Sequence, residues 1–149
     1  GMAASNQAVG LPRQLRFNLL SACSYVNNGA RQLLEPFDLT PKQYDILLLL
    51  DENGPEPLSI QNVRKKLADK MSDASRLIDR LYKKGLLDKT PSSEDRRSNL
   101  VALTDKGRDL LEELSAKYSS TDQQIDRNLD KKQLDQLNEL LEKLVTGEK

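Results

Sequence analysis

The sequence predicts a mainly α-helical fold with one small β-hairpin, and three features indicate it. Apolar residues recur at helical spacing along most of the 149 residues. Around residues 86–103 that spacing gives way to two short apolar runs flanking a polar, basic tip. Helical patterns lie on both sides of this hairpin. Together these features predict a winged helix-turn-helix flanked by N- and C-terminal helices.

The first helix is expected to begin at Pro12, because proline is tolerated in the first turn of a helix. Residues 1–10 are small and polar and are expected to be frayed. Pro36 disfavours helical backbone at the residue before it, so the helix should end at Glu35. Its apolar positions are Leu15, Leu19, Ala22, Cys23, Val26, Ala30, Leu33 and Leu34.

The second helix is predicted over 41–52, with Thr40 as its N-cap and the breaker Asn53-Gly54-Pro55 after it. Its run of leucines also fits a fully buried strand, but the Thr-Pro start favours a helix. Ser59 is expected to cap a short third helix. Its apolar positions are Ile60, Val63 and Leu67.

The fourth helix, over 72–84, is the candidate recognition helix of the helix-turn-helix. Ser72 is a suitable N-cap, and Gly85 suits the left-handed position after the helix. Its two faces differ in polarity, since one carries Ala74, Leu77, Ile78 and Leu81 and the other carries Asp73, Ser75, Arg76, Asp79 and Arg80. A polar, basic surface helix followed by a basic hairpin suits a DNA duplex.

Two more helices are expected after the hairpin. Thr104 and Asp105 should cap one long helix that reaches Leu129, and a last helix should start near Lys131. The apolar stripes of these helices and of the first helix need a partner surface. The simplest partner is a second copy of the chain, because two-fold dimers are the commonest oligomers. The alternative is that these helices pack onto the winged helix-turn-helix of the same chain. We therefore predict a helical dimerisation region over 11–38 and 109–146, and a DNA-binding domain over 39–108.

The net charge of zero hides an asymmetry within the chain. Residues 55–108 contain thirteen basic and eight acidic residues, an excess of five positive charges. A local positive field of this kind favours a nucleic-acid partner, although a solvated lysine-rich surface would look similar.

The composition argues against an enzyme. The chain has no histidine, so Ser-His and Cys-His pairs and histidine-ligated metals are excluded, and it has no glycine-rich phosphate loop. We expect no cofactor. No apolar run has the length of a membrane span, and the single Cys23 cannot form an internal disulfide. These features predict a cytoplasmic protein without membrane contact.

Several segments, taken in order, resemble the MarR (multiple antibiotic resistance regulator) family of transcription factors over residues 12–145. They are Leu39–Leu47, Ser75–Leu81, Lys84–Leu87, Glu94–Arg97 and Leu103–Arg108. The resemblance implies a two-fold dimer that binds pseudo-palindromic operators. Members of this family are often repressors that are released from DNA by small phenolic or other aromatic effectors, or by oxidation, and the resemblance implies such a repressor here.

The predicted site has four groups of residues. On the recognition helix, Ser72, Asp73, Ser75 and Arg76 are candidates for base edges. Candidates for phosphate contacts are Arg80, Lys83, Lys84 and Lys89. By the resemblance, Asp95 and Arg97 match the wing motif Asp-x-Arg, in which the aspartate steadies an arginine that enters the minor groove, and Arg96 adjoins it as a phosphate contact. The resemblance also implies an effector pocket where the dimerisation helices meet the DNA-binding domain. Tyr25, Phe37 and Tyr44 are the candidate aromatic rings of this pocket, although they could equally be packed in the hydrophobic core.

Two further expectations complete the analysis. The peroxide-sensing branch of the family carries its cysteine earlier in the first helix, whereas Cys23 lies about two turns later among Ala22, Tyr25 and Val26. Cys23 is therefore expected to be a small buried residue without a switching role. The alternative function is a winged-helix adaptor that contacts proteins without specific DNA binding, but an adaptor does not need arginines at the hairpin tip.

Overall fold

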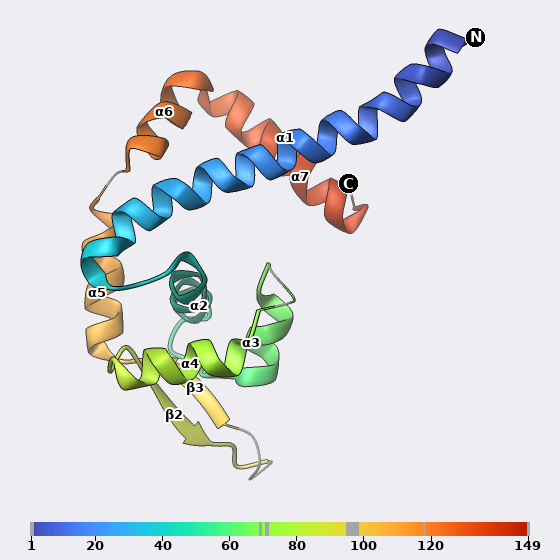
Figure 1. Cartoon of the computed structure of the whole chain (residues 1–149). Coiled ribbons are helices and arrows are strands. Elements are labelled where there is room, and N and C mark those ends of the chain that lie inside the picture. The colour runs from blue at the N-terminus through green and yellow to red at the C-terminus, as the bar shows by residue number, and fades with distance from the viewer. Residues whose placement is uncertain (1, 69, 71, 95–98, 118, 149) are drawn as a thin grey trace. The chain divides into compact units, whose positions relative to one another are not determined.

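The computed structural model describes residues 2–68, 70, 72–94, 99–117 and 119–148. The chain forms two compact units (Figure 1). One unit comprises residues 31–117, and the other comprises residues 1–30 together with 118–149.

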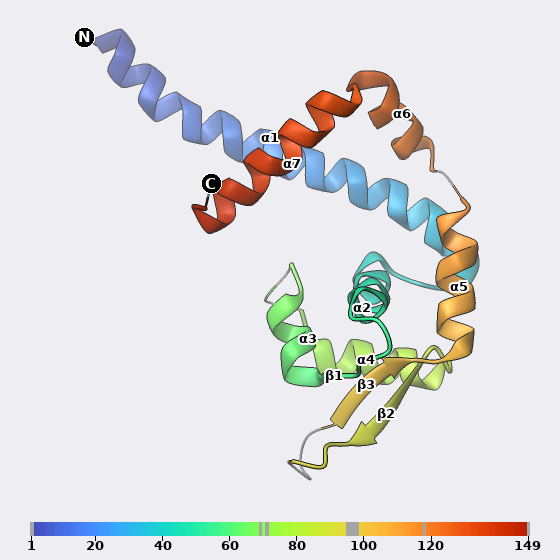
Figure 2. The ribbon, with the colours of Figure 1, turned by 180° about the vertical axis from the view of Figure 1, so that it is seen from behind.

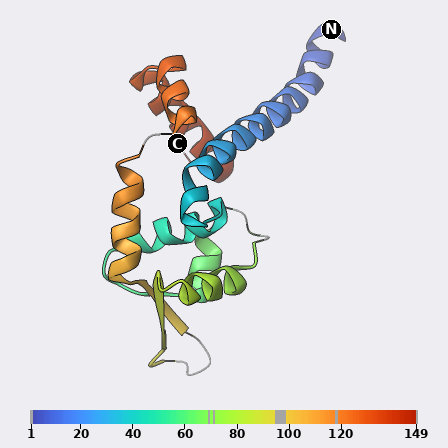
Figure 3. The same cartoon turned by 60° about the vertical axis from the view of Figure 1, so that its left-hand side comes forward.

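The unit of residues 31–117 contains the predicted winged helix-turn-helix. Its elements are η1 (Glu35–Phe37), α2 (Pro41–Glu52), β1 (Leu58–Ser59), α3 (Ile60–Lys66), α4 (Ala74–Lys83), β2 (Leu87–Pro91), β3 (Asn99–Leu103) and α5 (Asp105–Ser115). Three helices, α2, α3 and α4, pack together, and the hairpin of β2 and β3 extends beyond α4, as Figures 1, 2 and 3 show from different sides. The three strands are antiparallel in the order β1-β3-β2.

The core of this unit is apolar, and α2, α3, α4 and α5 each contribute to it. Leu34, at the end of α1 (Met2–Leu34), is also fully buried. Burial of such side chains is the main favourable term in folding. The fully or almost fully buried side chains are Leu34, Ile46, Leu47, Leu50, Val63, Ile78, Leu81, Leu87, Val101 and Leu114.

The predicted starts of α2 and α3 are confirmed. The Thr40 hydroxyl accepts a hydrogen bond from the Gln43 amide, and the Gln43 side chain accepts one from the Thr40 amide, which completes a capping box. The Ser59 hydroxyl accepts from the Asn62 amide in the same way. These local bonds fix where both helices begin.

The expected start of the first helix is wrong. The helix α1 begins at Met2, so residues 2–10 are helical and Pro12 lies inside the helix. Good helix formers such as Ala3, Ala4 and Gln7 precede the proline and favour this extension. The helix ends at Leu34, one residue earlier than expected, and Pro36 occupies the short 3₁₀ helix η1.

The expected single helix after the hairpin is also wrong. It is divided into α5, which ends at Ser115, and α6 (Ser120–Asn128). Ser119 starts α6 with a capping box to Asp122, so a new helix begins where the apolar period suggested continuation. The last helix, α7 (Lys131–Thr146), begins where predicted, with Asp130 as its cap. The short strand β1, which pairs with β3, was not predicted.

The second unit contains residues 2–30 of α1 together with α6 and α7. Gly29 packs against Thr121 so closely that a Cβ at this glycine would lie 2.4 Å from the Thr121 hydroxyl oxygen. Many large apolar side chains of α1 and α7 are nevertheless exposed within the single chain. They are Leu11, Leu15, Phe17, Leu20, Tyr25, Val26, Leu137, Leu140, Leu141, Leu144 and Val145. None of the described helices combines the length and apolar character that spanning a membrane requires.

Candidate nucleic-acid interface

The helix α4 presents one apolar and one polar face, as the sequence predicted. Ala74, Ile78 and Leu81 are fully buried against the core, and Leu77 is half-buried. The opposite face exposes Ser75, Arg76, Asp79 and Arg80. The helix is therefore held by its apolar stripe and offers its polar side chains to a partner.

The N-cap of α4 differs from the prediction by one residue. Asp73, and not Ser72, caps the helix, since its carboxylate oxygen Oδ1 accepts from the Arg76 amide at 3.2 Å. A carboxylate has the further advantage of interacting with the positive end of the helix dipole. Asp73 therefore stabilises the start of α4, a structural role that its prediction as a base contact did not include.

The preceding helix α3 contributes a contact to the same surface. The guanidinium of Arg64 donates to the Ser75 hydroxyl at 3.4 Å, which links the two helices of the helix-turn-helix. Arg64 was not among the predicted site residues. The run Arg64-Lys65-Lys66 at the end of α3 is the signal in the sequence that could have identified it.

Three cations on α4 are available to an anionic partner. Arg76, Arg80 and Lys83 are exposed, and none of them forms an ion pair within the described part of the chain. Their spacing places them on successive turns of the polar face. They therefore form a row of positive charge without an ion-pair partner among the described residues, although the charge of Lys83 also helps to lower the pKa of Asp79.

Two other predicted phosphate contacts have partners within the chain. The Lys84 ammonium group donates to the Asp38 backbone carbonyl and lies 3.2 Å from its carboxylate. The Lys89 ammonium group lies 2.6 Å from the Asp79 carboxylate and 4.7 Å from the centre of the Tyr82 ring. The hydrogen bond and charge of Lys89 lower the pKa of Asp79 below its ordinary value. As phosphate contacts, Lys84 and Lys89 stay predictions.

The wing is a regular antiparallel hairpin up to its tip. Leu87 pairs with Leu103, Lys89 with Val101 and Pro91 with Asn99. The predicted minor-groove motif, with Asp95, Arg96 and Arg97, lies outside the described residues. Its role stays a prediction that rests on the sequence.

The base of the wing is joined to the start of α5 by several hydrogen bonds. The Thr104 hydroxyl donates to the Gly85 carbonyl at 2.6 Å, and the Thr104 amide donates to the Leu86 carbonyl at 3.2 Å. Gly85 adopts a left-handed conformation with φ of 75°, as predicted. A Cβ at Gly107 would lie 2.1 Å from the Leu86 carbonyl oxygen, so this close approach requires glycine.

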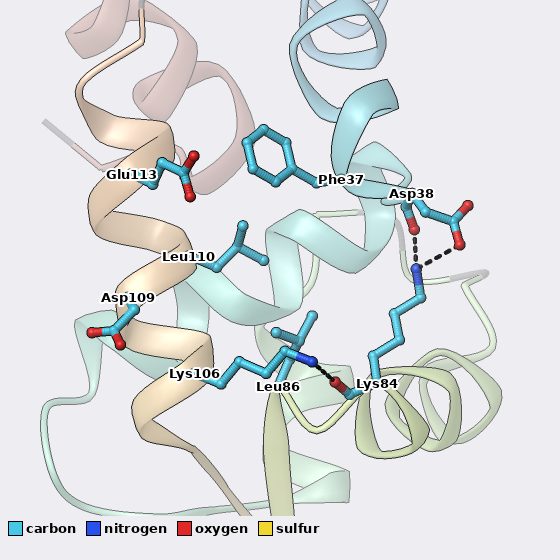
Figure 4. Close-up of a pocket in the computed structure, with 8 residues that line it drawn as sticks. All are labelled: Phe37, Asp38, Lys84, Leu86, Lys106, Asp109, Leu110 and Glu113. Atoms are coloured by element: carbon cyan, nitrogen blue, oxygen red, sulfur yellow. Dashed lines mark hydrogen bonds and ion pairs between the residues drawn. The ribbon is translucent and has the colours of Figure 1, made fainter.

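A cavity of about 480 Å³ lies beside this junction (Figure 4). Its apolar lining comes from Phe37, Leu86 and Leu110, and its polar lining from Asp38, Lys84, Lys106, Asp109 and Glu113. The amine of Lys106 donates to the Lys84 carbonyl at 2.8 Å.

The three rings predicted for an effector pocket are not all at this cavity. Phe37 lines it, Tyr44 lies on α2 and is not one of its described lining residues, and Tyr25 belongs to the other unit. Their role in ligand binding stays a prediction.

The expected burial of Cys23 is wrong for the single chain. The thiol is exposed, and its sulfur accepts a hydrogen bond from the Asn27 side chain at 3.6 Å. Cys23 lies on α1, much of whose apolar surface is uncovered in one copy of the chain. Among the described residues, no group of three or more His, Cys, Asp and Glu side chains is placed to hold a metal ion.

Comparison with known proteins identifies related regulators. The model of the MarR family matches residues 39–99. An uncharacterised HTH-type transcriptional regulator of Bacillus subtilis, YhbI, is 34% identical over 118 residues, which cover 77% of this chain and 75% of that protein. The HTH-type transcriptional repressor IacR of Pseudomonas putida is 30% identical over 118 residues, covering 79% of this chain and 69% of IacR.

Solved structures show the same fold. The transcriptional repressor CouR, bound to a 23-mer DNA duplex, superimposes with a TM-score of 0.75 at 29% identity, covering 91% of this chain and 94% of CouR. A mutant MarR from E. coli complexed with operator DNA gives a TM-score of 0.72 at 24% identity, covering 93% of this chain and 96% of that one.

Proposed function

Because this chain belongs to the MarR family, we propose that it is a sequence-specific DNA-binding repressor that acts in the cytoplasm as a homodimer. The observation that carries the proposal is the row of exposed cations Arg76, Arg80 and Lys83 on the polar face of α4, none of which forms an ion pair among the described residues. This helix is the second helix of a helix-turn-helix, the element that such proteins place in the major groove. The named repressor IacR and the DNA-bound CouR support this function.

The uncovered apolar side chains of α1 and α7 support the dimer. An apolar surface of this extent is unusual on a monomer and indicates an interface. Each buried Å² of apolar surface contributes roughly 25 cal/mol, so covering these side chains provides a substantial driving force. A second copy brings an identical surface, and a two-fold axis would place two recognition helices about 34–36 Å apart, in successive major grooves.

Operator binding tests the DNA part of the proposal. We expect the chain to bind DNA from upstream of its own gene more tightly than an unrelated duplex, with affinity that falls steeply as salt rises. Replacing Arg80 with alanine should lower the salt slope by about one, because one phosphate contact is lost. The matched control is Lys132→Ala, which removes an exposed cation of α7, outside the helix-turn-helix. Equal affinity of the wild type for both duplexes would favour the protein-binding adaptor instead.

Sedimentation tests the dimer separately. A dimer at micromolar concentration is expected, and replacing Leu140 or Leu144 with aspartate should shift the chain toward monomer. Both side chains are exposed in the single chain, so the substitutions do not disturb its core. A wild-type monomer at micromolar concentration would contradict the proposal.

The cavity beside Phe37 supports release by a small aromatic or phenolic effector. Phe37, Leu86 and Leu110 offer apolar surface for a flat ring, and the amines of Lys84 and Lys106 could interact with an acidic group. A ligand there would contact both the end of α4 and the start of α5. Such a ligand could therefore displace the recognition helix.

A panel of phenolic acids tests this effector site. At least one compound should raise the melting temperature and weaken operator binding. Leu110→Trp should fill part of the cavity and abolish both effects. Glu56→Trp, which places the same ring at an exposed loop position outside the lining residues, should preserve them. The site would be refuted if Leu110→Trp left the response unchanged.

A further inference from the structure

Lys89 belongs to the wing strand β2, yet its ammonium group is held by the recognition helix. The nitrogen lies 2.6 Å from the Asp79 carboxylate, which makes a short, charge-assisted hydrogen bond. It also lies 4.7 Å from the centre of the Tyr82 ring, within the range of a cation–π contact. Its side chain is only 23% exposed.

The contact adds a side-chain link between α4 and β2, whose backbones are joined only near the base of the wing in the described residues, where the Leu86 amide donates to the Leu81 carbonyl at 3.1 Å. Lys89 is the middle residue of β2 and pairs with Val101 of β3, so the hairpin holds its main chain. Asp79 and Tyr82 are three residues apart on α4 and lie on neighbouring turns of the helix. A cation between them ties the strand to the helix at a point between the base of the wing and its tip.

The contact also neutralises an acid on the face that carries the cations. Asp79 is 57% exposed and lies between Arg76 and Arg80 in the sequence of α4. An unpaired carboxylate at this position would repel DNA phosphates. Arg76, Arg80 and Lys83 have no comparable partner in the described residues, so Lys89 differs from them in its environment.

We propose that Lys89 is a positioning residue, which fixes the wing strand on the recognition helix and neutralises Asp79, instead of a phosphate contact. The inference rests on the proposed DNA binding and specifies how the two reading elements keep a fixed spacing. A recognition helix and a wing that enter adjacent grooves must hold that spacing before they meet DNA, because ordering them on binding would reduce affinity.

A double-mutant cycle on operator affinity tests the role. If Lys89 acts through Asp79, Lys89→Met should raise the Kd roughly three- to tenfold in the wild-type background, the scale of one typical hydrogen bond, because the pair is partly exposed to solvent. In the Asp79→Asn background the same substitution should change the Kd less than about twofold, because its partner is already absent. Lys89→Arg should retain most of the affinity, since a guanidinium can also pair with a carboxylate and stack on a ring.

The matched control is Arg80→Met, which should raise the Kd equally in both backgrounds. The proposal would be overturned if Lys89→Met also acted equally in both backgrounds and lowered the salt slope by about one in each, the behaviour of a phosphate contact.

A measurement on the free protein separates this inference from the proposed function. In a ¹H–¹³C spectrum, the Lys89 methylene protons next to the nitrogen should be shifted upfield by the Tyr82 ring and should return to ordinary values in Tyr82→Leu. Unshifted protons in the wild type would overturn the positioning contact alone. Failure of the wild type to prefer its operator would overturn the proposed function.

Discussion

Replacing Gly107 with alanine tests how closely α5 is seated against the base of the wing. The added methyl carbon would lie 2.1 Å from the Leu86 carbonyl oxygen and 3.2 Å from a methyl carbon of Leu103. The carbonyl cannot easily retreat, because it accepts a hydrogen bond from the Thr104 amide, and the Leu86 amide is bonded to the Leu81 carbonyl at 3.1 Å. The helix or the strand must therefore move by about 1 Å to reach ordinary contact distance.

The size of the effect follows from three contributions. Overpacking at a rigid site costs about 1–3 kcal/mol. Weakening the Thr104 hydrogen bond adds about 1 kcal/mol, while the better helix propensity of alanine offsets about 1 kcal/mol. We expect the free energy of unfolding to fall by about 1–3 kcal/mol.

Urea denaturation followed by circular dichroism measures this change. Gly10→Ala is the matched control, since Gly10 is also helical but has no atom within 4 Å of the added carbon. That variant should be unchanged or more stable by up to about 1 kcal/mol. If Gly107→Ala were as stable as Gly10→Ala, the close approach at the wing base would be refuted.

Four further predictions follow from individual residues. Arg97→Ala should leave the fold and the dimer intact but weaken operator binding by about 1–3 kcal/mol, the scale of a good groove contact; equal binding at moderate salt would contradict the wing motif. Thr40→Ala should lower the free energy of unfolding by about 1 kcal/mol in urea denaturation, because the cap of α2 is lost. Because Lys89 lowers the pKa of Asp79, the paired carboxylate stabilises the fold above its ordinary value of 3.8, and thermal melts should show the advantage over Asp79→Asn disappearing as the pH falls below that value. Cys23→Ser should leave any release of DNA by peroxide unchanged, as measured by fluorescence anisotropy.

Helix starts were predictable because caps are local. Thr40, Ser59 and Thr104 were each recognised from the residue type before an apolar run, and each makes the expected side-chain bond. Ser72 and Asp73 are adjacent residues that can both cap a helix. The sequence therefore could not decide between them.

Other features depend on information that is weak or absent in a local pattern. The break before α6 was missed because the apolar spacing from Leu114 to Ile125 continues through it. A strand of two residues, such as β1, is too short to show a period. The burial of Leu34 in the core of the unit of residues 31–117 is likewise decided by tertiary packing, which the local sequence does not show.

The same distinction applies to the candidate site. The exposed face of α4 followed from helical periodicity, so Arg76 and Arg80 were placed correctly on it. The partners of the lysines could not be predicted, because Lys84 meets Asp38 from 46 residues away and Lys89 reaches a helix from a strand. Which cations are free is decided by tertiary contacts.

The Asp73 cap has a consequence for discrimination among DNA sequences. The amino end of a helix attracts anions, and phosphates of every DNA sequence are such anions. In α4 the Asp73 carboxylate already accepts a hydrogen bond from the Arg76 amide. This end of the helix therefore carries a negative charge, which disfavours the binding of phosphates there. We expect the cap to lower background affinity for all DNA alike. A regulator must find its operator among about 10⁶–10⁹ competing genomic sites, so a weaker background leaves more of the protein free to occupy the correct one.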